Sequence, residues 1–123
     1  MDGVGHQKLM ITDIQWNAIQ RIVVLIAERQ YEEAVQFCRG SRLNAEDIKG
    51  AVVTYGRTIV PLPQTARSLT SSIRISKAVP PRWSVVVPLF TIEEDRSDLS
   101  LELTISEPEP GCPTIQLDGL HVL

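Results

Sequence analysis

The sequence predicts an α+β fold, in which three N-terminal helices pack on a curved, four-stranded antiparallel sheet. Two observations support this prediction. Apolar residues recur every three or four positions up to about residue 56, which is typical of helices, and at every second position from Ile73 onward, which is typical of strands. A run of helices followed by a run of strands favours a sheet with helices on one face. The 123 residues suffice for one core, so we expect a flexible N-terminus over 1–12 and a single domain over 13–123.

Three helices are expected in the first half of the chain. Thr12 and Gln15 have the spacing of a capping box, which marks the start of the first helix. Gly40 is of the type that commonly ends a helix, here the second one. Asn44 is the expected N-cap of the third helix, and Gly56 is its expected end. The expected helices span about 13–29, 31–38 and 45–55.

The second half of the chain predicts four strands in a meander, with no helix between them. Pro61 ends the helical half. The run 83–87 is apolar on both faces, as in a central strand, and Pro88 then requires a bulge or an edge position. The alternation of the last strand changes phase at Asp118 and Gly119, which predicts a β-bulge there. The expected strands span about 73–79, 83–87, 99–106 and 115–122. A long helix across such a curved sheet would give a cone with a ligand cavity beneath the helix.

The formal net charge of −3 is unevenly distributed along the chain. Residues 1–60 are neutral, residues 61–82 carry four basic and no acidic side chains, and residues 83–123 carry one basic and eight acidic side chains. Either the basic segment pairs with the acidic one inside the sheet, or the acidic third forms a surface that attracts a cationic partner. Nucleic acid is not expected as a partner, because phosphate binding needs clustered Lys and Arg.

Several protein classes are excluded by what the sequence lacks. No apolar run approaches the roughly 20 residues of a membrane span, and the N-terminus has no apolar signal core, so we expect a cytoplasmic protein without a membrane partner. Cys38 and Cys112 are then expected to be free thiols. No zinc-type cysteine spacing, phosphate-binding loop or nucleophile motif occurs, so we predict no metal, no cofactor and no catalytic residue, and we favour a protein that is not an enzyme.

The densest polar cluster lies between the second and third expected strands, over 91–98. It is either a solvated hairpin turn or a partner-binding loop. A metal or catalytic site is disfavoured, because the regular ligand spacing and turn glycine of a calcium loop are missing. Together with one carboxylate on the following strand, this cluster gives the candidate partner-binding residues: Glu93, Glu94, Asp95, Asp98 and Glu102.

His121 belongs to a second candidate site, in the last strand. After the expected bulge it shares a face with Gln116 and Asp118, and Glu102 of the neighbouring strand is expected nearby. A histidine–carboxylate pair in a cavity can act as a general base. The alternative is a structural or surface histidine near the chain end.

Arg57 follows the third helix and has two interpretations. It would either pair with Asp98 or Glu102, and so lock the helices to the strands, or bind an anionic small ligand. Trp83 begins the central strand and is expected mainly as a core residue. The candidate pocket residues are Tyr55, Arg57, Trp83 and His121.

Three strings resemble a family of small bacterial proteins that carry a domain of unknown function. They are YGRTIVPLP (55–63), PPRWSVVVPLFTIEEDRSDLSLEL (80–103) and LDGLHVL (117–123). The resemblance covers roughly residues 20–123 and implies no catalytic residues. The order of elements is also loosely similar to the nuclear transport factor two-like cone fold. That superfamily includes enzymes, small-ligand binders and bacterial immunity proteins that neutralise toxins, so the fold does not define one function.

We therefore expect a non-enzymatic binding protein. In its most concrete form this is a bacterial immunity-type protein, a toxin inhibitor whose acidic sheet and turn surface covers a cationic toxin. One alternative is a cone-fold pocket protein that binds a small ligand or is a minor enzyme. Another is an accessory domain, with a homodimer formed through the open face of the sheet.

Overall fold

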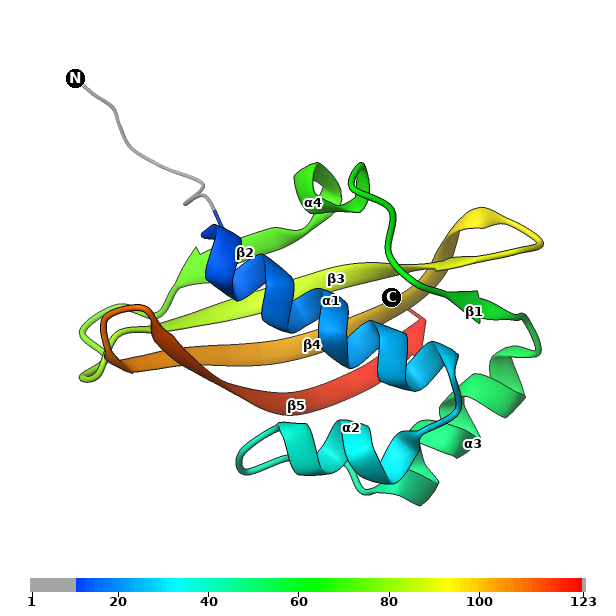
Figure 1. Ribbon diagram of the computed structural model, residues 1–123, viewed down its shortest axis with the longest axis horizontal. Coiled ribbons are helices and arrows are strands. Elements are labelled where there is room, and N and C mark those ends of the chain that lie inside the picture. The colour runs from blue at the N-terminus through cyan, green and yellow to red at the C-terminus, as the bar shows by residue number, and fades with distance from the viewer. Residues whose placement is uncertain (1–10, 123) are drawn as a thin grey trace.

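The computed structural model describes residues 11–122 of the chain (Figure 1). Over that range helices come first and strands follow, which confirms the α+β class expected from the sequence. The helices are α1 (Asp13–Ala27), α2 (Tyr31–Phe37), α3 (Ala45–Tyr55) and α4 (Ala66–Leu69). The strands are β1 (Ile59–Val60), β2 (Ser71–Arg74), β3 (Arg82–Thr91), β4 (Asp95–Glu109) and β5 (Cys112–Val122).

The sheet is antiparallel and four strands wide, although it contains five strands. β1 and β2 pair one after the other along the same edge of β3, with Ile59 opposite Thr91 and Ser71 opposite Val86. β3 pairs in turn with β4, and β4 with β5. The sheet curls into a half-barrel, α1 crosses one of its faces, and α2 and α3 lie beside β5 (Figure 1). The expected curved sheet with a central β3 is confirmed.

The helix boundaries follow local signals in the sequence. The Thr12 side chain accepts a hydrogen bond from the Gln15 N–H, and the Gln15 side chain accepts one from the Thr12 N–H, which completes a capping box. Asn44 and Asp47 form a second capping box at the start of α3. Gly56 ends α3 with φ of 75°, a left-handed conformation that favours glycine. These three expected boundaries are confirmed. The fourth is not, because α2 ends at Phe37 with Cys38 as its C-cap, before the expected end at Gly40.

The core fills the space between α1 and the sheet. Side chains from both layers meet there and are at most 1% exposed: Ile19, Ile22, Val23 and Ile26 from α1, and Val85, Val87, Leu89, Leu101, Leu103 and Leu117 from the sheet. Burial of each such side chain contributes about 1.5–3 kcal/mol. The cavity expected beneath the helix is therefore occupied by these described apolar side chains.

The pairing of the three long strands is interrupted by two register shifts. The register between β3 and β4 shifts between Pro88 and Phe90: Pro88 pairs with Ser100 but Phe90 pairs with Arg96, so the extra residues bulge from β4, opposite Leu89. In β5, Gly119 pairs with Glu102 while Leu117 pairs with Leu103, which leaves Asp118 as the extra residue. The bulge in β5 was expected from the change of phase. The irregularity between β3 and β4 begins beside Pro88, where a bulge or an edge position was expected, but its extra residues belong to β4.

Two short elements between α3 and β2 differ from the expectation. β1 has only two residues, and α4 is a single turn that buries Ala66 and ends where the Thr70 hydroxyl donates to the Ala66 carbonyl. Neither element was expected. No helix lies between β2, β3, β4 and β5, the strands that correspond to the four expected ones. A one-turn helix after two prolines has too few residues to show a helical period.

The strand β2 also differs from the one expected over 73–79. It spans Ser71–Arg74, buries Ser72 and leaves Ile73 66% exposed, so the apolar residues are on the outward side. Val79 is 89% exposed in the loop that follows. The alternation of apolar and polar residues correctly indicates an extended chain here, but it does not decide which side of the strand faces the core.

The N-terminal boundary of the fold lies at Ile11 within the described residues. Ile11 is buried, and its carbonyl accepts a hydrogen bond from the Arg67 guanidinium. Thr12 caps α1. Most of the segment expected to be flexible, residues 1–10, lies outside the described residues.

The outer edge of β5 is occupied by the loop between α2 and α3. The Arg39 N–H donates to the Ile115 carbonyl at 2.7 Å, and the Arg42 N–H donates to the Leu117 carbonyl at 2.8 Å. These two bonds satisfy carbonyl groups that β4, on the other side of β5, does not reach.

Candidate functional site

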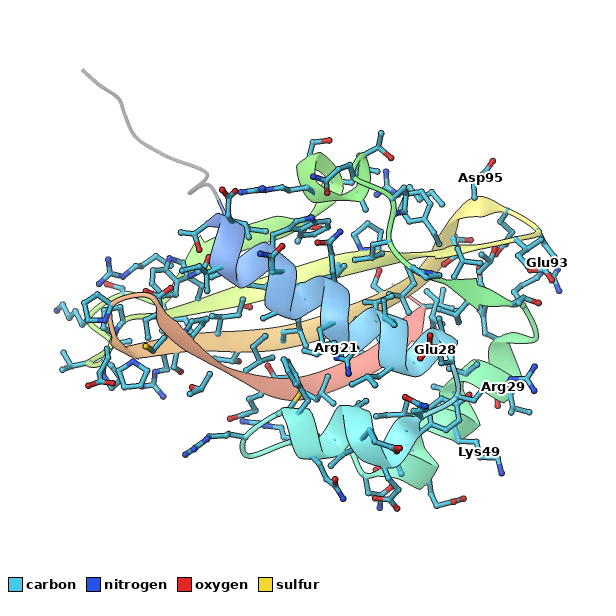
Figure 2. The ribbon with its side chains drawn as sticks, in the orientation of Figure 1. Arg21, Glu28, Arg29, Lys49, Glu93 and Asp95 are labelled. Atoms are coloured by element: carbon cyan, nitrogen blue, oxygen red, sulfur yellow. The ribbon has the colours of Figure 1, made fainter. Side chains whose placement is uncertain are left out.

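The turn between β3 and β4 and the start of β4 carry four carboxylates, Glu93, Glu94, Asp95 and Asp98, which we call the acidic tip. All four are exposed, and Figure 2 shows Glu93 and Asp95 at one end of the molecule. Asp95 has φ of 60°, which closes the tight turn. Glu102, the fifth expected partner-binding residue, lies further along β4 opposite Gly119, so the structure separates it from the other four.

Tyr55, at the end of α3, holds the acidic tip to the helices. Its hydroxyl donates to Glu94 Oε1 at 2.8 Å and accepts a hydrogen bond from the Asp98 N–H at 3.1 Å. The Glu94 N–H also donates to Thr91 Oγ1 at 3.0 Å. The link between the third helix and the acidic turn that was expected from Arg57 is therefore made by Tyr55.

Arg57 does not pair with Asp98 or Glu102. Its guanidinium donates to the Gly56 carbonyl at 3.3 Å, and its side chain is exposed. The physical reason is the left-handed turn at Gly56, which changes the direction of the chain between Tyr55 and Arg57. This finding corrects the expected helix-to-strand ion pair.

Glu93 is held by the loop that follows α3. The Thr58 N–H and the Thr58 hydroxyl each donate to one Glu93 carboxylate oxygen at 2.9 Å. These bonds, with a smaller contribution from the nearby Arg57 guanidinium, lower the pKa of Glu93 from its ordinary value. The Ile92 N–H also donates to the Thr58 carbonyl at 3.0 Å. The tip is thus fixed at several points, and Glu93 is ionised at neutral pH.

His121 and Glu102 form the pair expected from the sequence, with 3.3 Å between His121 Nε2 and Glu102 Oε2. Their side chains are 50% and 35% exposed. Gly119 leaves the space for this pair, because an added Cβ would lie 3.1 Å from both Glu102 Oε1 and His121 Cε1. A carboxylate partner of this kind fixes the orientation and tautomer of the imidazole ring.

Asp118 organises the polar side chains beside this pair. It accepts hydrogen bonds from Thr104 Oγ1 at 2.6 Å and from Gln116 Nε2 at 2.8 Å. The Arg42 Nε lies 3.7 Å from Asp118. The bulge therefore brings together the polar residues of the last strand, and it links them to the loop between α2 and α3.

The four candidate pocket residues do not share one cavity. Tyr55 and His121 line the same hollow, of about 420 Å³, between α3 and the end of β5. Arg57 lines a separate hollow of about 550 Å³. Trp83 is half-buried near the opposite end of β3, with the Arg74 guanidinium 5.7 Å from its ring centroid. The structure thus brings together two of the four.

The basic segment does not neutralise the acidic one. Arg67 forms an ion pair with Asp13 of α1 at 2.9 Å, and Arg74 stacks on Trp83. None of the basic side chains in 61–82 forms an ion pair with an acidic side chain that the structure describes in 83–122. Direct ion pairs between the two segments are thus not found among the described residues, and the acidic surface for a cationic partner stays a prediction.

The cysteines are both free, Cys38 buried and Cys112 exposed. Burial raises the pKa of Cys38 to about 12, so its thiol stays protonated at neutral pH and fills space as an apolar group. Within residues 11–122, no three His, Cys, Asp or Glu side chains are grouped to hold a metal ion. No described helix has the length and apolar character needed to cross a membrane.

Sequence reasoning does not single out every residue that builds these surfaces. Thr58 is a common residue in a loop, and no sequence signal connects it to Glu93, 35 positions later. Arg29 lies in the turn between α1 and α2, Lys49 lies on α3, and the two meet only in the folded chain. The sequence does indicate that Lys49, Val53 and Gly56 lie on one side of α3, because they recur at helical spacing.

The geometry defines a small α+β half-barrel domain with a packed interior and with its polar and charged groups gathered on the surface. The chain belongs to the family described as Domain of unknown function (DUF7668), whose sequence profile matches residues 23–123. The matched region contains the whole sheet, α2, α3, the acidic tip and the Glu102–His121 pair. The expected resemblance to a domain of unknown function is thereby confirmed. The chain has no match among curated proteins or among solved structures.

Proposed function

We propose that the chain is a non-enzymatic binding protein and that the acidic tip contacts a basic protein partner. The observation that carries this proposal is the way the tip is held: Tyr55 and Thr58 fix two of its four carboxylates from the helical side. These contacts present the tip to a partner as a preformed surface.

The electrostatics of the tip favour a cationic partner. Asp95 and Asp98 form no ion pair with any described side chain, so their charges are available at the surface. The anchored Glu93 and Glu94 hold the shape of the tip, and its concentrated negative field speeds the encounter with a positive surface. Ile92, 69% exposed at the same turn, adds an apolar contact beside the charges.

In its finer form the proposal is an immunity-type protein that inhibits a toxin. A nuclease active site is lined by Lys and Arg that bind phosphates. A rigid acidic hairpin can enter such a cleft and occupy the positions of the phosphates. The packed interior between α1 and the sheet supports a role at the surface rather than inside the domain.

The test compares two variants with the same loss of charge. Asp95→Asn/Asp98→Asn removes two charges from the tip, and Glu32→Gln/Glu33→Gln removes two exposed charges from α2. The partner assayed is the product of the neighbouring gene, and the readout is the association rate at low and high salt. We expect the tip variant to associate about tenfold more slowly and the control to change less than about twofold. Absence of a stable complex, or equal effects of the two variants, would contradict the proposal.

A second candidate function rests on the hollow that Tyr55 and His121 share. Its volume of about 420 Å³ suits a small ligand. Under this alternative, NMR screening of a fragment set should give shifts confined to Gly50, Ala51 and Leu120, and His121→Ala should abolish them. Shifts that persist in the variant would count against this candidate.

A further inference from the structure

A hollow at the end of the molecule where α1 turns into α2 is lined by three cationic side chains. Arg29, Lys49 and Arg57 line it, together with Tyr31, Val52, Val53 and Gly56, and its volume is about 550 Å³. Lys49, Val52, Val53 and Gly56 recur at helical spacing along one side of α3. Figure 2 shows Arg29 and Lys49 close to this end, with Arg21 further back along α1.

The three cations of this hollow form no direct ion pair within the described chain, although Glu93 lies close enough to Arg57 for its pKa to be lowered. No described acidic side chain lies within ion-pair distance of Arg29, Lys49 or Arg57. Three like charges around one hollow repel one another, and a bound anion would relieve that repulsion.

Two negative features border the hollow. Glu32, Glu33 and Glu46 line an adjoining hollow of about 260 Å³, which shares Arg29, Tyr31 and Lys49 with the first. The C-terminal end of α3 also lies here and carries about half a negative charge. Part of that negative charge is already neutralised, because the Gly56 carbonyl accepts a hydrogen bond from the Arg57 guanidinium. The three glutamates stay outside the larger hollow, whose described lining has Arg29, Lys49 and Arg57 as its charged side chains.

The backbone at Arg29 gives an independent observation. Arg29 has φ of 62°, in the left-handed region, and follows α1 at the position where glycine is favoured. The Arg29 N–H donates to the Ile26 carbonyl at 3.0 Å, and the Gln30 N–H donates to the Leu25 carbonyl at 2.8 Å, as in a Schellman motif. An arginine is thus held in a strained conformation that glycine would adopt freely. The Schellman motif requires this conformation, and it fixes the backbone that carries the Arg29 side chain at the hollow.

We infer that this hollow binds a small organic phosphate monoester. The phosphate, with a charge of about −1.5 to −2 at pH 7, would lie among Arg29, Lys49 and Arg57, and the planar guanidinium groups suit its oxygens. A singly charged carboxylate needs only one cationic partner, so three cations favour a doubly charged phosphate over a carboxylate. The apolar body of the ligand would lie on Val52, Val53 and the half-buried Tyr31 ring. This surface differs from the acidic tip, and the inference does not depend on the proposed function.

The experiment uses phenyl phosphate, inorganic phosphate and benzoate as probes, with binding to the full chain followed by amide NMR shifts at physiological salt. We expect phenyl phosphate to shift Lys49, Val53 and Arg57 saturably, and to bind more tightly than either other probe. The variant Arg29→Gly should weaken this binding by about tenfold or more, since a charged hydrogen-bond donor is lost. The control Arg21→Gln removes the same charge from α1, outside the hollow, and should leave binding within about twofold.

Arg29→Gly is chosen because glycine suits the backbone at this position, so the variant should remain folded. Its unfolding curve, measured beside the binding, separates a lost site from a lost fold. No saturable binding, equal weakening by Arg21→Gln, or equal affinity for benzoate would overturn the inference. Equal affinity for inorganic phosphate would also overturn it, because the apolar part of the hollow would then contribute nothing.

Discussion

The hydroxyl of Tyr55, the last residue of α3, donates a 2.8 Å hydrogen bond to Glu94 in the turn between β3 and β4. The two residues are 39 positions apart, and the same hydroxyl accepts from the Asp98 N–H. One side chain therefore couples the end of the helical half to the most acidic segment of the sheet.

Removing that hydroxyl should loosen the acidic tip. Tyr55→Phe loses both hydrogen bonds, and because they are exposed we expect a loss of about 1 kcal/mol in the free energy of unfolding. Thermal unfolding measures the loss, and hydrogen exchange at the Asp98 amide should become faster. Tyr31→Phe is the control, since its hydroxyl forms no described hydrogen bond within the chain. Equal effects of the two variants would show that the Tyr55 contacts do not hold the tip.

The Thr58–Glu93 contact should give the protein a specific response to acid. Because the pKa of Glu93 is lowered in the folded chain, its ionised form stabilises the fold above the ordinary value of 4.5, and this stabilisation is lost as pH falls through the lowered pKa. Thr58→Val should therefore be more destabilising at pH 7 than at pH 3, as measured by urea unfolding. An NMR titration should show the Glu93 pKa moving up toward 4.5 in this variant. Thr114→Val, on β5, is the control and should leave that titration unchanged.

Gly119 should be intolerant of even a methyl group. In Gly119→Ala the new Cβ would lie 3.1 Å from Glu102 Oε1 and His121 Cε1, so the pair must move apart. We expect a loss of about 1 kcal/mol in unfolding free energy, and a smaller loss when the change is made in a Glu102→Ala background. Gly50→Ala is the matched control, because its Cβ meets nothing within 4 Å, and alanine in a helix should add about 0.5–1 kcal/mol. Equal losses in both backgrounds would mean that Glu102 is not the obstacle.

The strain at Arg29 predicts a variant that is more stable than the wild type. A left-handed conformation costs a non-glycine residue about 1–2 kcal/mol, and glycine loses about 0.5–1 kcal/mol more in chain entropy on folding. Arg29→Gly should therefore gain about 0.5–1 kcal/mol in urea unfolding. Arg29→Ala also loses the side chain but keeps the strain, so it should gain nothing. If the alanine and glycine variants unfold alike, the backbone at this position is not strained.

The two cysteines should differ sharply in reactivity. Cys112 is exposed, whereas burial raises the pKa of Cys38 to about 12 and removes its thiolate at neutral pH. Alkylation of the native protein should therefore modify Cys112 alone, and modification of Cys38 should require unfolding. In Cys112→Ser, rapid labelling of the native protein should disappear. Rapid labelling of this variant would place Cys38 within reach of solvent.

The features that could be predicted from the sequence are those fixed within a few residues. The capping boxes at Thr12 and Asn44 need only the residue three positions later, and the left-handed end at Gly56 needs only glycine. The bulge at Asp118 is visible because the alternation of apolar residues changes phase there. Local chemistry decides all of these before any long-range contact forms.

The features that could not be predicted depend on how distant segments meet. The alternation of apolar residues around Ile73 indicates an extended chain. It does not show that Ser72, rather than Ile73, faces the core, because the pairing of β2 with β3 decides which side faces inward. The choice of Tyr55 rather than Arg57 as the anchor of the acidic tip follows from the turn at Gly56. Arg29 and Lys49 become neighbours only after α1, α2 and α3 have packed together.

The loop between α2 and α3 also affects how copies of this chain can associate. An exposed strand edge is a template for another strand, and through it proteins swap domains or grow into fibrils. At β5 the amides of Arg39 and Arg42 already occupy the Ile115 and Leu117 carbonyls. A second molecule could add a strand there only after it had displaced this loop from the β5 edge. This part of the edge is thus closed to strand addition by the fold itself.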